Sequence, residues 1–88
     1  MLPFEQSRVG KNKVVRTFAD DVPEEELKWH RDAEDRVVRV IGETDWGIQF
    51  DNRLPQRLKG EVVIPAGVYH RVIKGTGELR VEITMEKR

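Results

Sequence analysis

Histidine is the residue type in this chain best suited to chemistry, because the 88-residue sequence has two histidines and no cysteine. The lack of cysteine excludes disulfides, thiolate metal sites and a cysteine nucleophile. His70 is flanked at alternate positions by Val68 and Val72, which places it on an apolar face of an extended segment. Such a histidine is either a buried side chain hydrogen-bonded to a carboxylate or a carbonyl, or a metal ligand. The other, His30, has charged residues at both alternate positions, which is equally consistent with a solvent-exposed side chain.

The element that must position His70 is predicted over residues 60–75 as a strand, a tight turn and a second strand. The β-branched residues 62–64 favour the first strand. Pro65 ends it, because proline has no N–H to donate to a ladder. Gly67 supplies the backbone freedom that a tight turn needs. The second strand then begins at Val68, and the two strands are predicted to form a hairpin.

The run from Gly60 to His70 resembles the second sequence motif of the cupin barrel, whose final histidine is a metal ligand. The stretch between Gly60 and Pro65 is one residue shorter than is usual in that family. The remainder of the motif, Pro-x-Gly-x-x-His, is intact.

Residues 29–42 resemble the first cupin motif, which carries a His-x-His pair, then a glutamate and a glycine. His30 matches the first histidine, and Asp32 stands where the second would be. Alignment on the final glycine puts Asp35 at the glutamate position and leaves an acidic oxygen ligand there. Alignment on the strand that follows puts Arg36 there instead, which argues against a metal.

The metal ligands that the resemblance implies come from both motifs: His30, Asp32, Asp35 and His70, with Glu34 as an alternative oxygen donor. Residues at i and i+2 of a strand project from one face, and a neighbouring strand supplies the third ligand. Imidazole and carboxylate together suit iron, manganese, nickel or zinc, and a facial set of three leaves coordination positions open. By alternation, Gln49 is also expected to line the pocket.

The rest of the chain predicts short strands separated by turn signals roughly every eight to ten residues, a pattern typical of sandwiches and barrels. The clearest segments are Val14–Phe18, Arg36–Ile41, Trp46–Phe50 and Leu79–Met85, with a short irregular strand over residues 54–58. The predicted fold is all-β, a small antiparallel β-sandwich or jelly-roll barrel of the cupin type. It has seven to nine strands in a single domain over residues 1–88.

Two segments are harder to assign. Residues 1–12 carry little pattern and are expected to be a loose lead-in. Residues 20–36 fit a short charged helix capped at Asp21, or a strand with Leu27, Trp29 and Arg31 on one face. The resemblance favours the strand.

Several large side chains are expected to have structural rather than functional roles. Trp29 and Trp46 are expected in the core. The strand arginines are expected on solvated faces, in cross-strand ion pairs with acidic residues. They are Arg36, Arg39, Arg71 and Arg80.

Composition narrows the classes of partner. The 16 basic and 16 acidic residues balance, so no general electrostatic attraction to nucleic acid or an anionic membrane is expected. No apolar run approaches the roughly 20 residues of a membrane span, and we expect a cytoplasmic protein. Short exposed edge strands favour a homodimer that pairs through a sheet edge.

The function that this sequence predicts is that of a small cupin-like protein with a polar pocket. The pocket binds a divalent metal through two histidines and a carboxylate, and acts on or senses a small molecule. Cupins include dioxygenases, isomerases, sugar-modifying enzymes and ligand-sensing or storage proteins, so the resemblance does not choose a reaction. The alternative is a metal-free binding or interaction module without catalysis, in which a buried Asp–Arg–His network replaces the metal.

Overall fold

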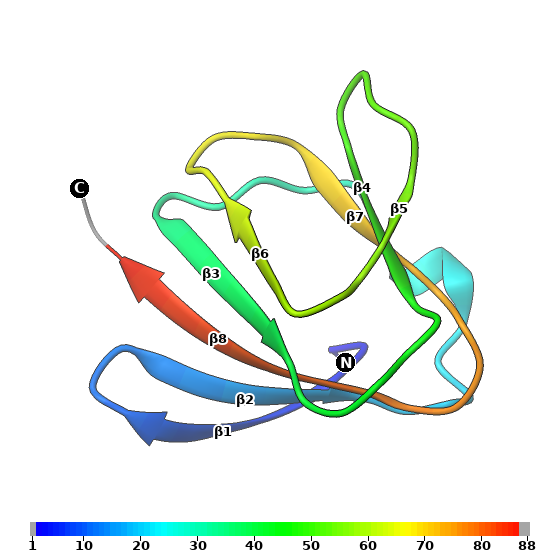
Figure 1. Ribbon diagram of the computed structural model, residues 1–88, viewed down its shortest axis with the longest axis horizontal. Helices are drawn as coiled ribbons and strands as arrows, with labels where there is room; N and C mark the ends of the chain where they lie inside the picture. Colours follow the sequence, from blue (N-terminus) through cyan, green and yellow to red (C-terminus); the bar gives the residue numbers. More distant parts are fainter. Residues whose placement is uncertain (1, 87–88) are drawn as a thin grey trace.

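The computed structural model describes residues 2–86 and consists almost entirely of antiparallel strands (Figure 1). The elements follow in the order β1 (Glu5–Gly10), β2 (Lys13–Phe18), the 3-10 turn η1 (Glu24–Glu26), β3 (Asp35–Val40), β4 (Gly47–Phe50), β5 (Gln56–Arg57), β6 (Glu61–Ile64), β7 (His70–Ile73) and β8 (Leu79–Glu86). They form a five-stranded sheet in the order β1-β2-β8-β3-β6 and a three-stranded sheet in the order β5-β4-β7. The all-β antiparallel prediction is therefore confirmed.

Strand β8 is the centre of the larger sheet, because it pairs with β2 on one side and β3 on the other. Its alternating Leu79, Val81 and Ile83 are all buried and define the inner face of the sheet. In the register of the ladder, Val14 lies opposite Ile83 from β2, and Val38 lies opposite Ile83 from β3. The inner face is thus apolar across three neighbouring strands, as the sequence alternation predicts.

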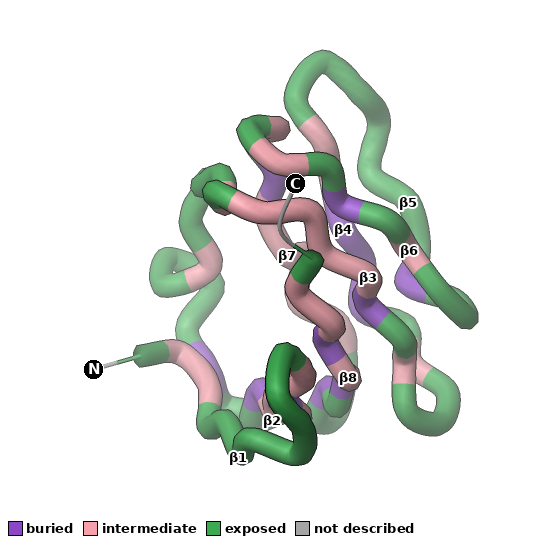
Figure 2. The backbone as a smooth tube through the Cα atoms, turned by 90° about the vertical axis from the view of Figure 1, so that its left-hand side faces the viewer, coloured by how far each residue is buried: buried purple, intermediate pink, exposed green. Residues whose placement is uncertain are grey.

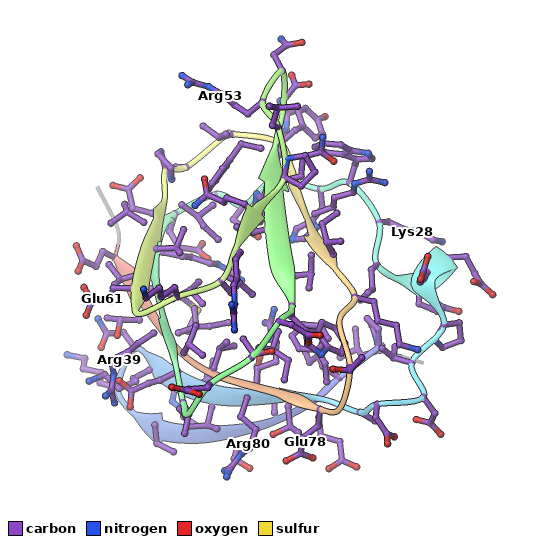
Figure 3. The ribbon with its side chains drawn as sticks, turned by 45° about the vertical axis from the view of Figure 1, so that its right-hand side comes forward. Lys28, Arg39, Arg53, Glu61, Glu78 and Arg80 are labelled. Atoms are coloured by element: carbon purple, nitrogen blue, oxygen red, sulfur yellow. The ribbon has the colours of Figure 1, made fainter. Side chains whose placement is uncertain are left out.

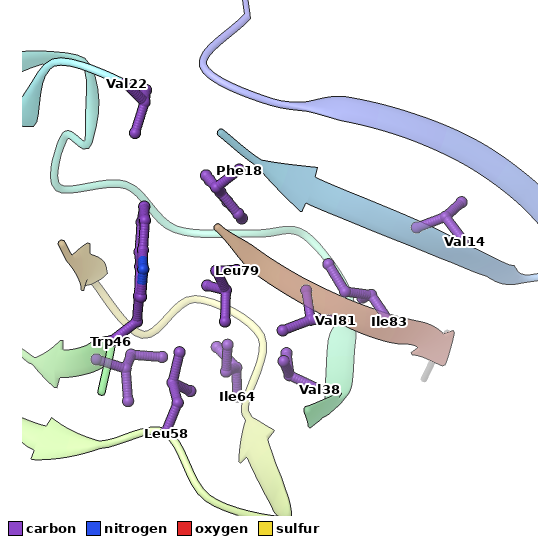
Figure 4. Close-up of a cluster of buried hydrophobic side chains, with 11 residues drawn as sticks. Val14, Phe18, Val22, Val38, Trp46, Leu58, Ile64, Leu79, Val81 and Ile83 are labelled. Carbon is purple, nitrogen blue, oxygen red and sulfur yellow. The ribbon is translucent and has the colours of Figure 1, made fainter. Parts of the chain in front are cut away.

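The hydrophobic core fills the space between the two sheets (Figure 4). Its buried members are Val14, Phe18, Val22, Val38, Trp46, Ile48, Leu58, Ile64, Leu79, Val81 and Ile83. Trp46 is fully buried and donates from its indole N–H to the Gly77 carbonyl at 3.2 Å, which satisfies its one polar atom. Figure 2 shows that burial is concentrated on the inner strands, whereas all of β1 is exposed. The prediction that Trp46 belongs to the core is confirmed.

The predicted hairpin over residues 60–75 is wrong, because β6 and β7 lie in different sheets. Strand β6 pairs with β3, and β7 pairs with β4. The turn at Pro65–Val68 carries the chain from one sheet to the other, with Gly67 at a positive φ of 80°. The Gly67 N–H donates to the Asp32 carbonyl at 2.9 Å, and this bond ties the turn to the segment before β3.

The prediction of a loose segment over residues 1–12 is wrong for the part that forms a strand, while Met1 lies outside the described residues. Residues 5–10 form β1, which pairs with β2 from Glu5 opposite Thr17 to Gly10 opposite Lys13. All six residues of β1 are exposed, so the strand carries no apolar alternation. Its backbone hydrogen bonds to β2 hold it in place, and these leave no trace in a hydrophobic pattern.

Neither prediction for residues 20–36 describes the whole segment. The helical part is the short turn η1, closed by Glu26 N–H to the Pro23 carbonyl and Leu27 N–H to the Glu24 carbonyl. The chain then runs extended beside β7, where His30 forms an isolated bridge with His70 (Figure 1). Among the described residues, only that one rung of a ladder forms between this segment and β7.

The outer surface is charged, and Figure 3 shows Lys28, Arg39, Arg53, Glu61, Glu78 and Arg80 on the periphery. Among residues 2–86, no helix is long and apolar enough to cross a membrane. Strands β1 and β6 are the two edges of the larger sheet. Pairing of two copies through such an edge stays a prediction.

Gly75 offers a test of how the loops are packed. An added Cβ at this position would lie 2.7 Å from the backbone nitrogen of Trp46. It would also overlap Asp45, whose side chain accepts two hydrogen bonds from Thr76. We expect Gly75→Ala to lower the free energy of unfolding by about 1–3 kcal/mol, because the contact is with backbone that cannot move freely. Urea denaturation monitored by tryptophan fluorescence measures it.

Gly10→Ala is the matched control, since an added Cβ there meets only the Lys13 Cβ at 3.4 Å, an ordinary contact. Equal urea midpoints for the two variants would contradict this packing.

Candidate metal centre

The two histidines are brought together by the backbone. The His30 N–H donates to the His70 carbonyl at 3.0 Å, and the His70 N–H donates back to the His30 carbonyl at 2.9 Å. Directly opposed residues of an antiparallel pair place their side chains side by side. The imidazole rings accordingly lie with their centroids 4.3 Å apart.

Both imidazoles are oriented by the same local contact. The Nδ1 of His30 lies 2.9 Å from the Lys28 carbonyl oxygen, and the Nδ1 of His70 lies 2.9 Å from the Val68 carbonyl oxygen. A carbonyl oxygen only accepts hydrogen bonds, so Nδ1 carries the proton in each ring. In the neutral form of such a ring Nε2 therefore has a free lone pair, the form in which histidine binds metals.

Asp32 completes the group. Its Oδ2 lies 3.4 Å from the His70 Nε2 and is buried without a hydrogen-bond partner among the described residues. Its Oδ1 lies 3.5 Å from Nη2 of Arg36. A buried carboxylate oxygen without a donor is unfavourable, and here it faces the lone pair of a neutral imidazole.

One ligand atom from each of His30, Asp32 and His70 falls within 4.8 Å of the others. The three residues differ in solvent exposure. His30 is exposed, whereas the Asp32 and His70 side chains are only 8% and 4% exposed. Solvent can thus reach the group at His30, while the side chains of Asp32 and His70 are largely buried. The structure is compatible with metal binding at these three residues.

The surroundings of His70 disfavour its protonated form. Burial is the largest influence and lowers the pKa of His70, because the imidazolium form loses its hydration. The charges of His30 and Arg36 lower the pKa of His70 further, while the hydrogen bond to Val68 and the charge of Asp32 raise it. The balance is a pKa below the usual 6.5, so the fold favours the neutral form of His70.

A cavity of about 400 Å³ opens beside the three residues. Its deep wall is the apolar core, including Ile48, Leu58 and Val81. Pro3 and Phe4 also line it, together with the segment that follows η1. Such a cavity, mostly apolar with a few polar groups at one end, is the usual form of a small-molecule site.

Arg16 also lines this cavity, and the sequence analysis did not single it out. Its backbone partner across the ladder is the buried Val81, so its side chain stands on the inner face of the sheet. Burial first, and then the charge of Arg36, lower the pKa of Arg16 to about 10. The signal available in the sequence was its alternate position between Val14 and Phe18, where an apolar residue is expected.

The predicted ligand Asp35 lies outside the group of three. Its Oδ1 accepts the Ala66 N–H at 2.8 Å, so it holds the turn after β6. The alternative donor Glu34 also lies outside, and its Oε1 accepts two hydrogen bonds from Arg36, at 3.0 and 2.8 Å. Of the predicted set, the structure brings together His30, Asp32 and His70.

Gln49 does not line the cavity, contrary to expectation. It accepts a hydrogen bond from Nε of Arg71 at 3.0 Å and donates to the Arg53 carbonyl at 3.0 Å. The residues directly before and after Gln49 face the core instead: Ile48 belongs to it and Phe50 packs against it.

The expectations for the aromatic and basic side chains need two corrections. Trp29 is not in the core: it is 42% exposed, and the guanidinium of Arg71 lies 4.9 Å from its ring centroid. Arg36 does not lie on a solvated face but lines the cavity. Arg39 fits its prediction, since it forms a cross-strand ion pair with Glu82 at 3.1 Å.

Comparison with known proteins yields no match to a family model and no match among curated proteins. Solved structures do match. A cupin-2 domain protein from Shewanella frigidimarina is similar over 97% of this chain and 79% of its own, with 22% identity and a TM-score of 0.62. A cupin domain from Bordetella pertussis is similar over 94% of this chain and 91% of its own, with 22% identity and a TM-score of 0.62.

A third similar structure is the Fe(II) form of HppE. It matches 84% of this chain and 41% of its own length, with 14% identity and a TM-score of 0.63. At such identities the likeness concerns the fold alone. Together with the antiparallel two-sheet topology, these matches show that the chain adopts the fold of a small cupin-type domain.

Proposed function

We propose that this protein binds a divalent metal ion through Nε2 of His30, a carboxylate oxygen of Asp32 and Nε2 of His70, and uses it to bind or act on a small molecule in the adjoining cavity. The observation that carries the proposal is the buried Asp32 Oδ2, which lacks a hydrogen-bond partner and lies 3.4 Å from the His70 Nε2. A cation shared by these two atoms would remove both the unsatisfied oxygen and the opposition of two lone pairs.

The donor set narrows the choice of metal. Two imidazoles and one carboxylate suit iron, manganese, nickel or zinc, and a set of three leaves positions open for water or a ligand. The iron-containing HppE, which is similar in fold, supports iron as one candidate. When bound, such a metal supplies Lewis acidity to an oxygen of the small molecule.

The chain's own residues have separate roles in this proposal. The carbonyl groups of Lys28 and Val68 hold the two rings in the tautomer that binds metal. Arg36 holds one oxygen of Asp32, at 3.5 Å, and leaves the other oxygen toward His70. The apolar wall of the cavity limits water near the site.

The runner-up is a metal-free binding module, and the Arg36–Asp32 contact favours it. In that case Asp32 is neutralised by Arg36 on one side and by a protonated His70 on the other. This requires the imidazolium form of His70, which burial disfavours. Metal titration separates the two functions.

Metal titration of the purified, metal-free protein tests the proposal. We expect Zn²⁺ or Mn²⁺ to raise the thermal unfolding temperature, because a ligand at 100 times its Kd stabilises the native state by about 2.7 kcal/mol. His30→Ala, Asp32→Asn and His70→Ala should each lose most of this shift. Differential scanning fluorimetry and elemental analysis measure it.

Asp35→Asn is the matched control. It weakens the acceptor of the Ala66 N–H and so lowers the stability of the metal-free protein, yet it should keep the metal-induced shift. A native protein that gains no stability from iron, manganese, nickel or zinc would favour the metal-free module. If Asp35→Asn were the only variant to lose the metal-induced shift, Asp35 rather than Asp32 would be the carboxylate ligand, and the proposed site would be wrong.

The pH dependence of stability follows from His70. Its pKa is below 6.5 in the folded protein, so the unfolded chain takes up this proton more readily. The stabilisation from neutral His70 is fully present above about pH 6.5 and is lost as the pH falls from 6.5 through the lower pKa of the folded state. Without metal, the native protein should therefore lose more stability between about pH 7.5 and 5 than His70→Asn.

Urea denaturation of both proteins across this pH range makes the comparison. A native protein that gains stability relative to His70→Asn as the pH falls would show instead that His70 is stabilised as imidazolium by Asp32.

A further inference from the structure

Two arginines project into the cavity from positions that the strand pattern reserves for apolar residues. Arg16 stands on β2 at the alternate position between the buried Val14 and Phe18. Arg36 stands on β3 two residues before the buried Val38. Both line the cavity. Charged side chains are rarely placed on the inner face of a small β domain unless something there requires the charge.

Arg36 forms ion pairs with acidic residues, whereas Arg16 forms none within residues 2–86, although the charge of Asp32 acts on it. Arg36 contacts Asp32 at 3.5 Å and Glu34 at 2.8 Å. Among residues 2–86, Arg16 forms no salt bridge, and its hydrogen bond runs from Nε to the neutral Oε1 of Gln6 at 2.9 Å. The two terminal nitrogens of the Arg16 guanidinium are therefore not committed to any described residue.

The Arg16 guanidinium is also held in place. It lies 3.8 Å from the centroid of the Phe4 ring, and Phe4 packs on Phe18 with the ring centroids 5.4 Å apart. One side of the planar group is thus covered by an aromatic face, and its Nε is fixed by Gln6. A pre-oriented guanidinium with free terminal nitrogens matches the two oxygens of a carboxylate.

The charge of the cavity points the same way. Its partly buried charged lining residues are two cations and one anion, Arg16, Arg36 and Asp32, whereas Glu26 and Lys28 are exposed at its rim. A bound divalent metal would add further positive charge. Most of the remaining lining is apolar, including Ile48, Leu58 and Val72.

We propose that Arg16 receives the carboxylate of a small organic acid whose apolar body lies against the core wall of the cavity. A monoanion fits best, because one guanidinium lacks an acidic partner and the walls offer little to solvate a second charge. This inference deepens the proposed function by giving the chemical class of the small molecule. Binding at Arg16 can be measured without metal, so the two proposals fail independently.

Calorimetric titration of the metal-free protein with hexanoate tests the inference. We expect hexanoate to bind, and Arg16→Gln to bind it at least about tenfold more weakly, because a charge-assisted contact is lost. Hexanamide, the neutral analogue, should bind the native protein more weakly than hexanoate, and Arg16→Gln should no longer discriminate between the two. Arg39→Gln is the control, since Arg39 lies on the outer face in an ion pair with Glu82.

Arg16→Lys is a second variant, which keeps the test decisive if Arg16→Gln fails to fold. It keeps the charge without the planar fork, and it should bind hexanoate with an affinity between those of the native protein and Arg16→Gln.

The inference is overturned by a native protein that does not bind hexanoate, by equal affinities for hexanoate and hexanamide, or by an Arg16→Gln variant that binds as the native protein does. Tighter binding of inorganic phosphate than of hexanoate would also overturn it. Retained metal binding in Arg16→Gln, with hexanoate binding lost, supports both proposals separately.

Discussion

The paired backbone hydrogen bonds between His30 and His70 are the contact on which the candidate site depends. The segment that carries His30 and Asp32 belongs to no ladder, and this single bridge fixes it against β7. Two further bonds join the same region to the turn after β6: the Asp32 carbonyl accepts the Gly67 N–H, and the Asp35 carboxylate accepts the Ala66 N–H. The turn that moves the chain between sheets therefore also holds the site together. Residues far apart in sequence meet because one irregular segment is tied to both sheets.

The site is costly to a protein of this size, and that cost is an argument for function. A buried polar atom without a partner destabilises a fold by about 1–3 kcal/mol, and a charged one by more. This small domain places such an atom, Asp32 Oδ2, beside the imidazole of His70, and it sets Arg16 on the inner face without an ion pair among the described residues. A metal-free module would need His70 protonated, against the effect of its burial. A cation at the three side chains and an anion at Arg16 would together neutralise the polar end of the cavity.

Much of the fold could be predicted from sequence because alternation is a direct consequence of burial on one face. Strand β8 follows this rule, as do the burial of His70 and the exposure of Tyr69. Strand β1 could not be predicted, because it is held by backbone pairing and buries none of its residues. The pairing partners of β6 and β7 were also out of reach, since a tight turn does not reveal whether the strands beside it share a sheet. In the site, Arg36 rather than Asp35 faces the cavity, as the second of the two alignments had it, because the alternation of β3 alone does not tell which side is inside.

In the site that we propose, His30 and His70 present free Nε2 atoms to a cation beside Asp32. Long-range ¹H–¹⁵N correlation NMR of the ¹⁵N-labelled, metal-free protein at about pH 7.5 tests it most directly, because it distinguishes the two neutral tautomers and the imidazolium form. Our account predicts that both rings carry the proton on Nδ1, and that added Zn²⁺ shifts the Nε2 resonances of both. A proton on Nε2 of either ring, an imidazolium at His70, or Nε2 resonances that Zn²⁺ leaves unchanged would contradict it.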